Sequence, residues 1–303
     1  MNALVIGYGS IGTRHAGILN KLGCHTAVVS KREVDFSTVY RALEEALEKE
    51  GPDYVVIASA TNQHREMLLS LGRLGFTGTV LVEKPLFKDK VELPPLPFRK
   101  VFVAYNLRFH PVIQRLKSLL EDEVILSVQA YVGQYLPDWR PASDYRISYS
   151  ALADQGGGAL RDLSHELDYL TWLLGKWERV TAIGGHFSAL EITSDDVFSL
   201  LYSTGSCPTV SVQLNYLDRM TRRFVIINTG SRTIEADLIR GTITIDNECE
   251  SFITERDDTY RLMHQAILSG AEDGLCSLDE GFETMCLIEA AEQAARDGTW
   301  VQR

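Results

Sequence analysis

The sequence predicts an α/β protein of two parts, and two observations support this. In the first 105 residues, short apolar runs typical of buried parallel strands alternate with helix-forming stretches. From 178 to 246, runs such as DVFSLLYS and TVSVQLNYL alternate apolar and polar residues between turns, which is typical of antiparallel strands. We therefore expect one domain over residues 1–105, with a parallel sheet, and a second over 106–303, with a mostly antiparallel sheet.

Composition limits the class of protein. The 303 residues are 45% hydrophobic and 23% charged, which is ordinary for a globular protein. The formal net charge of −11 argues against nucleic-acid binding, which needs a basic stripe or domain. Small anionic substrates remain possible because a few arginines can make a local positive pocket. No apolar run is long enough for a membrane span, so we expect no membrane partner.

Cysteine usage and the N-terminus predict a cytoplasmic protein. The five cysteines are odd in number and widely spaced, which favours reduced thiols over a disulfide framework or a zinc site, so we expect no metal. The N-terminal MNALVIGYG enters a strand directly and has no signal-peptide pattern.

A glycine-rich loop joins the first strand to the first helix in ALVIGYGSIGTRHAGILNKLG. In a dinucleotide-binding fold, glycines at this spacing permit a tight turn, approach of the backbone to pyrophosphate, and close packing of helix on strand. Further apolar strands follow at residues 25–30, 53–59, 79–84 and 100–105. This context predicts a Rossmann-type dinucleotide site. Its expected contacts in the loop are Gly7, Gly9, Ser10, Ile11 and Gly12.

The end of the second strand reads VVSKRE and bears on the choice of cofactor. Ser30, Lys31 and Arg32 stand where an acidic residue would hold the ribose hydroxyls of NAD(H), so the sequence favours NADP(H), whose 2′-phosphate a cation accommodates. The alternative is that the two cations are solvated loop charges and that Glu33 or Asp35 reaches back to the ribose.

The next strand ends contribute further candidates. Thr61 and Asn62 follow the strand at 53–59 and are weak cofactor candidates. Glu83 and Lys84 end the strand at 79–84, at the edge where open α/β sheets bind ligands. A partly desolvated lysine there could exchange a proton with a substrate hydroxyl; the alternative is an ordinary ion pair at a strand end.

The connection between the fourth and fifth strands reads DKVELPPLPFRK. Its three prolines exclude a helix interior, so we expect an extended crossover loop. The sheet face beside it would then be covered by another subunit or by the loop itself.

The stretch GGGALRDLSHELDYLTWLLG, residues 156–175, predicts a helix with two different faces. Leucines at three- and four-residue spacing form a stripe that faces a core. Asp162, His165 and Tyr169 fall on another face, with Glu166 at its edge.

These motifs together resemble one family. GYGSIG, IASATNQH (57–64), EKP, YNLRFHP (105–111) and GGGALRDLSHELD occur in the order seen in the glucose-fructose oxidoreductase/inositol dehydrogenase/MocA superfamily. The resemblance implies an N-terminal Rossmann fold, and a C-terminal α+β domain on a large, mostly antiparallel open sheet. It implies NAD(P)-dependent oxidation or reduction of a sugar, polyol or sugar derivative. It also implies that Lys84 is catalytic, that the Lys84-Pro85 peptide is cis and that Asp162 lies beside the substrate.

The chain departs from the family pattern at one position. Many members carry histidine four residues after the aspartate, where this chain has Glu166, and the nearby imidazole is His165. We take Asp162 and His165 as the pair that orients and protonates the substrate oxygen, with Glu166 as the alternative. Local ion pairs and hydrogen bonds are the structural alternative for this face.

The remaining candidates are weaker. The segment GQYLPDWRPASDYRISYSALADQ is similar to short family members of bacterial surface-sugar biosynthesis, and its aromatic rings and guanidinium groups suit a sugar and an anion. Its arginines could instead pair with Asp138 and Asp144. We expect substrate-binding residues at Asn106, Arg108, Trp139, Arg140, Tyr145, Arg146, Glu166 and Tyr169. Helices at 258–270 and 277–298 are expected to close the second domain, and Arg261 and His264 could face the cleft.

The sequence thus predicts an NAD(P)-dependent dehydrogenase or reductase acting on a CH–OH group of a phosphorylated, nucleotide-linked or otherwise anionic sugar. NADP(H) is favoured, and a homodimer or homotetramer is implied by the resemblance. Two alternatives remain: a glycosidase that oxidises and re-reduces its sugar transiently, and a non-catalytic cofactor-binding regulator.

Overall fold

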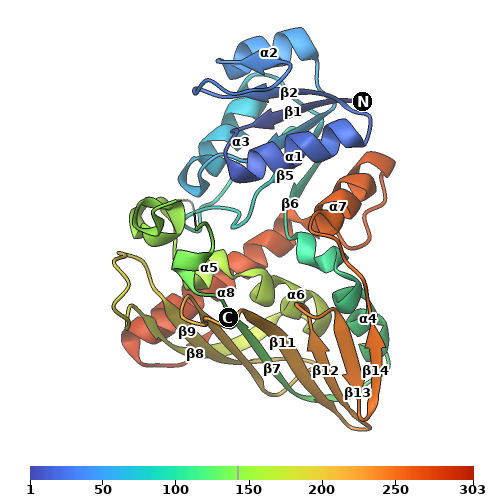
Figure 1. Cartoon of the computed structure of the whole chain (residues 1–303), viewed down its shortest axis with the longest axis vertical. Helices are drawn as coiled ribbons and strands as arrows, with labels where there is room; N and C mark the ends of the chain where they lie inside the picture. The colour runs from blue at the N-terminus through green and yellow to red at the C-terminus, as the bar shows by residue number, and fades with distance from the viewer. Residues whose placement is uncertain (142) are drawn as a thin grey trace. The chain divides into compact units, whose positions relative to one another are not determined.

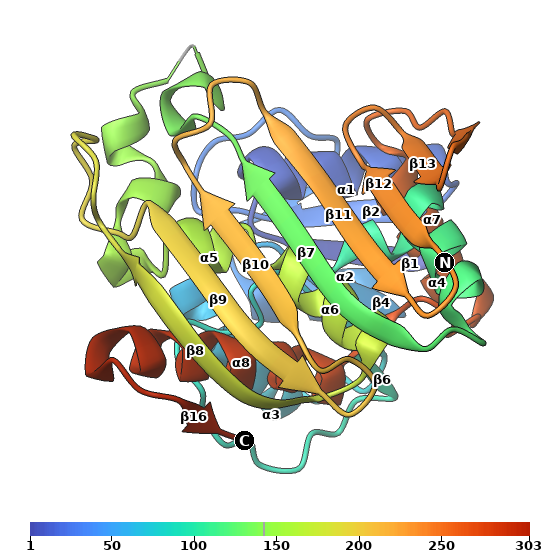
Figure 2. The same ribbon diagram turned by 90° about the horizontal axis from the view of Figure 1, so that it is seen from below.

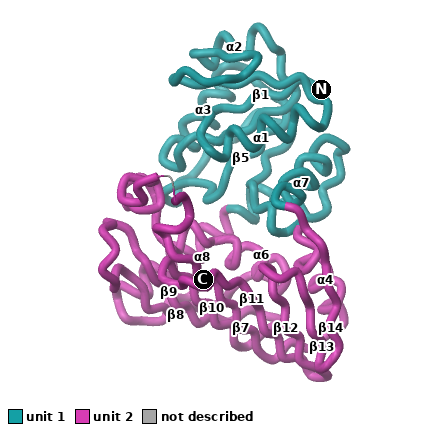
Figure 3. Tube along the Cα trace, in the orientation of Figure 1, with its two compact units in different colours: residues 1–109, 256–281 teal, residues 110–255, 282–303 magenta. Residues whose placement is uncertain are grey.

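The computed structural model of the chain describes residues 1–141 and 143–303. These residues form two compact units (Figure 3). Unit 1 comprises residues 1–109 and 256–281, and unit 2 comprises residues 110–255 and 282–303.

Unit 1 is built on a seven-stranded sheet in the order β15-β6-β5-β4-β1-β2-β3 (Figure 1). All neighbouring strands are parallel except the β15–β6 pair. Its strands are β1 (Asn2–Ile6), β2 (His25–Val29), β3 (Val39–Tyr40), β4 (Tyr54–Ile57), β5 (Thr79–Val82), β6 (Lys100–Val103) and β15 (Cys276–Ser277). The order reverses at β1, as in a Rossmann fold, so the predicted fold class is confirmed for this part.

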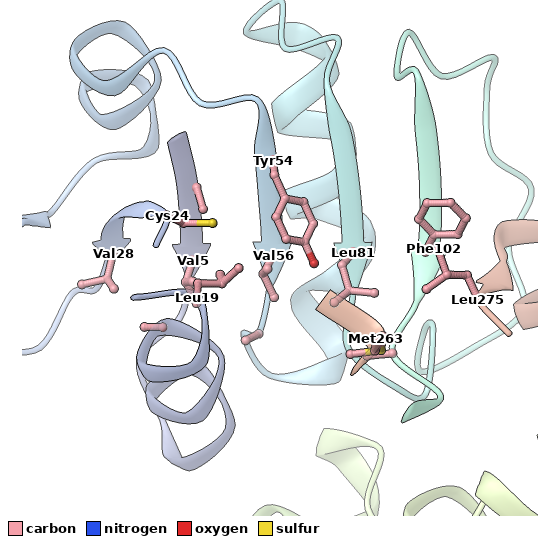
Figure 4. Close-up of a cluster of buried hydrophobic side chains, with 14 residues drawn as sticks. Val5, Leu19, Cys24, Val28, Tyr54, Val56, Leu81, Phe102, Met263 and Leu275 are labelled. Atoms are coloured by element: carbon pink, nitrogen blue, oxygen red, sulfur yellow. The ribbon is translucent and has the colours of Figure 1, made fainter. Parts of the chain in front are cut away.

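Helices cover both faces of this sheet. They are α1 (Ser10–Lys21), α2 (Leu43–Glu50), α3 (His64–Arg73) and α7 (Asp258–Ser269), with the 3-10 turns η1 (Thr61–Gln63) and η2 (Asn106–Phe109). Figure 4 shows one hydrophobic cluster, in which Met263 of α7 lies by Leu81 and Leu275 lies by Phe102. These apolar side chains are buried when residues 256–281, the late segment of unit 1, pack on β5 and β6. Their burial stabilises the attachment of this segment.

The late segment differs from the domain ranges expected from the sequence. Residues 256–281 belong to unit 1, whereas the sequence analysis grouped them with residues 106–303. The reason is local pairing: β15 adds to the edge of β6, with Cys276 opposite Val103. The helix at 258–270 is present as expected, but it completes the first unit rather than the second.

The connection from β5 to β6 contains no helix, as its prolines predict. Pro97 and Phe98 of this loop pack on α3, since the Phe98 and Phe76 rings lie 6.0 Å apart and a Cβ on Gly72 would meet Pro97 at 3.3 Å. The loop therefore packs against the α3 region, and what covers the sheet face beside it stays a prediction. The Lys84-Pro85 peptide is cis.

Unit 2 is built on a nine-stranded sheet in the order β14-β13-β12-β11-β7-β10-β9-β8-β16 (Figure 2). Only the β7–β10 pair is parallel. The strands are β7 (Ile125–Gly133), β8 (Trp177–Gly185), β9 (Val197–Thr204), β10 (Val210–Asn215), β11 (Arg222–Thr229), β12 (Thr233–Asp237), β13 (Thr242–Ile245), β14 (Glu248–Ser251) and β16 (Val301–Gln302). The expected large, mostly antiparallel sheet is confirmed.

The helices of unit 2 lie behind the sheet in the view of Figure 2. They are α4 (Pro111–Leu120), α5 (Ala159–Asp162), α6 (His165–Leu174) and α8 (Leu278–Asp297), whose first residues belong to unit 1. Short 3-10 turns, η3 (Leu136–Asp138), η4 (Tyr145–Ile147), η5 (Tyr149–Ala151) and η6 (Ala153–Gln155), lead from β7 to α5. Within the described residues, no helix is long and apolar enough to cross a membrane.

Candidate functional site

The glycine-rich loop has the backbone that its sequence predicts. Gly7 has a φ of +95°, and a Cβ there would lie 2.6 Å from the carbonyl oxygen of Ala58. A Cβ on Gly12 would lie 2.0 Å from the carbonyl oxygen of Gly7. Both contacts are with backbone atoms and leave no room for a side chain, so the turn and the packing of α1 on β1 require glycine here.

Gly9 is different because it faces open space. Among the described residues, the only atom within 4 Å of a Cβ built there is Nη2 of Arg32, at 3.9 Å. Gly9 is also the N-cap of α1, where no side chain caps the free N–H groups. Ser10 and Ile11 form the first turn of that helix. A helix N-terminus with uncapped N–H groups and an unobstructed glycine fits the pyrophosphate of a dinucleotide.

Positive charge gathers at the end of β2. The Ser30 hydroxyl donates a hydrogen bond to the carbonyl oxygen of Arg32 and accepts one from its N–H. These two bonds fix the turn. Lys31 and Arg32 are exposed, and Nη1 of Arg41 donates to the Ser30 carbonyl oxygen at 3.2 Å. Arg41 begins a separate segment after β3, and the sequence analysis did not identify it. Glu33 and Asp35 are exposed in the same loop.

The residues after β4 divide into buried and exposed ones. Thr61 is buried and Asn62 is exposed at the surface of η1. His64 is buried beside the carbonyl oxygens of Ser59, Pro85 and Leu86, at 3.1 to 3.2 Å. Burial lowers the pKa of His64. It therefore holds the segment that follows Lys84.

Glu83 and Lys84 follow β5 at the same sheet edge as the glycine-rich loop. The Glu83 side chain is buried, and its Oε2 accepts the backbone N–H of Lys84 at 3.1 Å. Its Oε1 lies 2.7 Å from Nε2 of His15, a residue of α1. Lys84 is half-buried. The carboxylate is thus bound to His15 and to the backbone of the lysine.

Two expected substrate contacts are engaged inside unit 1. Arg108 is 1% exposed, and its Nη1 donates to Glu280 at 3.0 Å. The Asn106 side chain is buried and donates to the Thr259 hydroxyl at 2.6 Å. Both residues lie in η2 and bind the late segment of the unit, an attachment that the sequence analysis did not foresee.

The helix expected over 156–175 is two helices. α5 ends at Asp162 and α6 begins at His165, and at the junction the Ser164 N–H reaches the carbonyl of Arg161 rather than that of Leu160. The single helix expected here is therefore interrupted at residues 163–164, and the common face of Asp162, His165 and Tyr169, which assumed ideal helix geometry, stays a prediction. The predicted leucine stripe is buried throughout. It comprises Leu160, Leu163, Leu167, Leu170 and Leu174.

Asp162 is bound from the end of β10. The Tyr216 hydroxyl donates to Oδ2 of Asp162 at 2.7 Å, and burial followed by the Asp162 charge raises the pKa of Tyr216 well above its usual value. Asp195, in the loop before β9, accepts the N–H of Leu160 at 2.9 Å and so caps α5 from another part of the chain. Burial raises the pKa of Asp195 to about 7, with the Glu292 and Asp162 charges adding to it.

Gly157 and Gly158 make room for these contacts. A Cβ on Gly158, whose φ is +129°, would lie 2.2 Å from the Asp195 carboxylate, and one on Gly157 would lie 2.2 Å from the Tyr149 carbonyl oxygen. The glycine run therefore brings α5 up to Asp195 rather than only starting a helix.

Glu166 and Tyr169 form a buried cluster with Arg223 of β11. Glu166 is 0% exposed, its Oε1 lies 2.9 Å from Nε of Arg223, and the Tyr169 hydroxyl donates to it at 3.5 Å. His165 is 9% exposed.

In the segment from β7 to α5, several candidate side chains are already hydrogen-bonded or ion-paired within the protein. Nε1 of Trp139 donates to the Gln134 carbonyl oxygen, and the Tyr145 hydroxyl accepts the N–H of Glu191. Arg146 pairs with Asp144, as the structural alternative held for this arginine, and also with Glu191. Arg140 is exposed. Ala142 lies outside the described residues.

The structure therefore assembles two sets of candidates, one within each unit. Unit 1 brings the glycine-rich loop, the Ser30–Arg32 turn and Lys84 to one sheet edge, and adds His15 and Arg41. Unit 2 holds Asp162 and adds Tyr216 and Asp195. These added residues had no sequence signal, since each meets its partner through tertiary packing.

Two family models match the chain. One, described as "Oxidoreductase family, NAD-binding Rossmann fold", matches residues 1–93, and another, "GFO/IDH/MocA C-terminal domain", matches residues 113–232. Together they cover well over half of the chain.

Individual proteins are similar at lower identity. An uncharacterised oxidoreductase of Streptococcus pneumoniae serotype 4 is 24% identical over 254 residues, which are 77% of this chain and 67% of the relative. A 2,7-anhydro-N-acetylneuraminate hydratase of Mediterraneibacter gnavus is 24% identical over 256 residues, 79% of this chain and 66% of the relative. The matched regions thus span about two thirds of these relatives.

A solved structure of levoglucosan dehydrogenase in complex with NADH superposes with a TM-score of 0.86 at 16% identity, covering 100% of this chain and 98% of that one. At that identity the likeness concerns the fold. The two family models match in chain order, and each matches the unit whose architecture fits it. They identify the chain as an oxidoreductase of the Gfo/Idh/MocA family with an NAD-binding Rossmann domain.

Proposed function

We propose that this protein is an NADP(H)-dependent oxidoreductase that moves a hydride between nicotinamide C4 and a carbinol or carbonyl carbon of an anionic carbohydrate. The observation that carries the proposal is the sheet edge of unit 1, where Lys84, the open Gly9 and the uncapped N-terminus of α1 follow neighbouring parallel strands. A lysine at the ligand-binding edge of a dinucleotide fold is suited to meet a reacting hydroxyl.

The division of labour follows the two units. Unit 1 binds the dinucleotide, whose nicotinamide supplies hydride chemistry when bound. Lys84 takes or returns the hydroxyl proton, and its charge stabilises an alkoxide as it forms. In unit 2, Asp162 orients the substrate oxygen and His165 exchanges its proton. The proposal requires Lys84 and His165 to reach the same substrate.

The substrate class rests on the relatives and on one arginine. Levoglucosan dehydrogenase and 2,7-anhydro-N-acetylneuraminate hydratase both carry a carbohydrate in their names, and the second sugar is acidic. Among the residues that the structure describes, Arg146 is neutralised by carboxylates, which leaves the exposed Arg140 as the better anion contact. Aromatic rings at Trp139 and Tyr145 would pack on the sugar.

NADP(H) preference rests on the charges near β2 alone. Arg32 lies by Gly9, and Arg41 donates to the carbonyl of Ser30, so two guanidinium groups at this strand end are available to bind a 2′-phosphate. The levoglucosan dehydrogenase structure contains NADH, so NAD(H) is the competing cofactor. Assembly as a homodimer or homotetramer in the cytoplasm remains our expectation.

The test is a nicotinamide absorbance screen of the purified chain against hexose phosphates, amino-sugar phosphates and nucleotide sugars, in both directions and with both cofactors. Lys84→Met should lower kcat by about a hundredfold or more while cofactor binding persists. Lys21→Met, which removes an exposed lysine at the end of α1, is the matched control and should leave kcat unchanged. Full activity in Lys84→Met would refute the assignment.

The hydratase among the relatives favours one second candidate, a reaction with transient rather than net redox change. It predicts product formation without a change in nicotinamide absorbance, together with exchange of a substrate carbon-bound hydrogen for solvent deuterium. Turnover that consumes cofactor in proportion to product excludes it.

A further inference from the structure

Four buried side chains form a continuous hydrogen-bonded chain inside unit 1. Oε1 of Glu83 lies 2.7 Å from Nε2 of His15, and Nδ1 of His15 lies 2.7 Å from Nε2 of His264. Nδ1 of His264 then lies 2.9 Å from the Tyr54 hydroxyl. The exposed fractions are 6% for Glu83, 0% for both histidines and 1% for Tyr54. We call these residues the Glu83–Tyr54 chain.

The chain joins elements that are distant in sequence. His15 lies on α1, three residues after the last glycine of the loop, and Tyr54 begins β4. His264 comes from α7, 249 residues after His15. Tyr260, also of α7, packs edge-on against the His15 ring with centroids 5.5 Å apart. The late segment of unit 1 thus reaches the sheet edge through polar contacts as well as apolar ones.

When Glu83 acts only as an acceptor, the donors and acceptors of the Glu83–Tyr54 chain fit together in two ways. Burial, with the charge of His15 second, lowers the pKa of His264 well below its usual value, so this ring is neutral and carries one proton. With that proton on Nε2, Tyr54 donates to His264, His264 to His15, and His15 to Glu83. With it on Nδ1, a doubly protonated His15 donates at both of its nitrogens. Glu83 accepts a hydrogen bond from His15 in both arrangements.

The other end of the chain is the proposed catalytic lysine. Oε2 of Glu83 accepts the backbone N–H of Lys84, so the His15–Glu83 contact fixes the polypeptide backbone on the N-terminal side of Lys84. On the other side, His64 contacts the carbonyl oxygens of Pro85 and Leu86. Buried imidazoles therefore hold the backbone on both sides of Lys84: His15 acts through Glu83, and His64 binds the residues that follow. Of these two, His15 is the one that is hydrogen-bonded onward to α7.

Stability alone does not explain this arrangement. Burying four polar groups costs free energy unless all are paired, and an apolar set of the same volume would hold α1, α7 and β4 together at least as well. A fully paired polar network holds its side chains in one defined geometry, whereas apolar packing fixes their geometry less tightly. Here the defined geometry ends on the backbone of Lys84.

We propose that His15 and His264 are positioning residues: through Glu83 they set the backbone of Lys84, so that α7 controls how the lysine meets its substrate. This inference rests on the proposed role of Lys84. Loss of either imidazole should leave the dinucleotide loop intact, because the closest contacts of Gly7 and Gly12 are with backbone atoms. It should change the reactivity of the Lys84 amine and the rate of the chemical step.

The first measurement is independent of any substrate. Trace acetic anhydride labels lysine amines of the full-length chain over a range of pH, and mass spectrometry gives the labelling rate of Lys84 relative to exposed Lys21. We expect His15→Gln and His264→Gln to change that ratio, and its pH profile, by about threefold or more. The matched control is His25→Gln, which breaks an exposed histidine–carboxylate pair to Glu50 (2.9 Å) on the same unit and should change nothing.

The second measurement uses the best substrate of the screen. Both variants should lower kcat by about tenfold or more and displace its pH profile, with cofactor dissociation constants within about twofold of the original. If a histidine variant does not fold, Tyr54→Phe removes one hydroxyl at the far end and should cause a smaller change of the same kind.

The outcomes separate the two proposals. Unchanged Lys84 labelling in His15→Gln, His264→Gln and Tyr54→Phe overturns the positioning role even if Lys84→Met is inactive. Weaker cofactor binding and a lower melting temperature, with labelling and pH profile unchanged, would show a structural role only and also overturn it. Full activity in Lys84→Met, by contrast, refutes the proposed function itself.

Discussion

The Tyr216 hydroxyl lies 2.7 Å from the Asp162 carboxylate and joins the end of β10 to α5. Both side chains are buried, so the contact is a charge-assisted hydrogen bond in a site with little water. It is the contact through which the sheet of unit 2 holds the proposed substrate-orienting carboxylate.

Tyr216→Phe should therefore lower the free energy of unfolding by about 2 kcal/mol, because it removes a hydrogen bond to a buried charge. It should also lower kcat by loosening Asp162. Tyr202→Phe is the matched control: Tyr202 is buried in the same unit, and within the described residues its hydroxyl has no hydrogen-bond partner. Equal stability losses in the two variants, measured by urea unfolding, would contradict the prediction.

Gly12→Ala should abolish dinucleotide binding. Its Cβ would lie 2.0 Å from the Gly7 carbonyl oxygen, so α1 must move away from the strand and its N-terminus away from the phosphates. Gly17→Ala on the same helix meets nothing within 4 Å and should raise stability by up to about 1 kcal/mol through helix propensity. NADPH fluorescence titration and thermal unfolding of both variants measure the contrast. Retained affinity in Gly12→Ala would show that the loop does not bind the pyrophosphate.

Arg32→Ala and Arg41→Ala should each weaken NADP(H) binding by about tenfold and leave NAD(H) binding nearly unchanged, since only the former carries a 2′-phosphate. Isothermal titration with both cofactors gives the selectivity ratio. Arg65→Ala, which removes an exposed cation from α3, controls for the change in net charge. An unchanged ratio in both variants would favour NAD(H) bound through Glu33 or Asp35.

The protein should lose stability in mild acid partly through His110. Burial, with the Arg223 charge second, lowers the pKa of this histidine to about 4. Below a pH of about 6.5, the ordinary pKa of histidine, His110 becomes protonated in the unfolded chain but stays neutral in the folded protein. The free energy of unfolding therefore falls as the pH drops. The loss reaches about 2 kcal/mol near pH 5.

His110→Asn should reduce that loss while preserving the cap of α4, where the side chain accepts the Val112 N–H. Urea unfolding at about pH 8 and pH 5 measures the slope. The prediction fails if the variant and the original protein lose the same free energy between these two values.

The sequence analysis predicted best where a residue's role is set by its immediate neighbours. The glycine-rich loop requires glycine because backbone atoms approach within the same strand–turn–helix unit, and the parallel strands alone bring Lys84 to the same edge. The absence of a helix before β6 followed from prolines that cannot occupy one.

It failed where geometry depends on distant residues. The leucine spacing continues through Leu163, so the hydrophobic pattern gave no sign of the junction between α5 and α6. Asp195 and Tyr216 meet α5 only when β9 and β10 are in place. His264, which the sequence suggested could face the cleft, is buried against His15, because no local pattern reports a partner 249 residues away.

The return of residues 256–281 to unit 1 affects how the protein emerges from the ribosome. At about 5 to 20 residues per second, synthesis of unit 2 delays α7 and β15 by on the order of ten seconds. During that interval β6 is an unprotected edge strand, and the apolar surface later covered by Met263 and Leu275 is open to water. Most of the Rossmann unit is thus translated before unit 2 but completed only after most of unit 2 has been made, and in the interval it exposes a surface that the mature molecule hides.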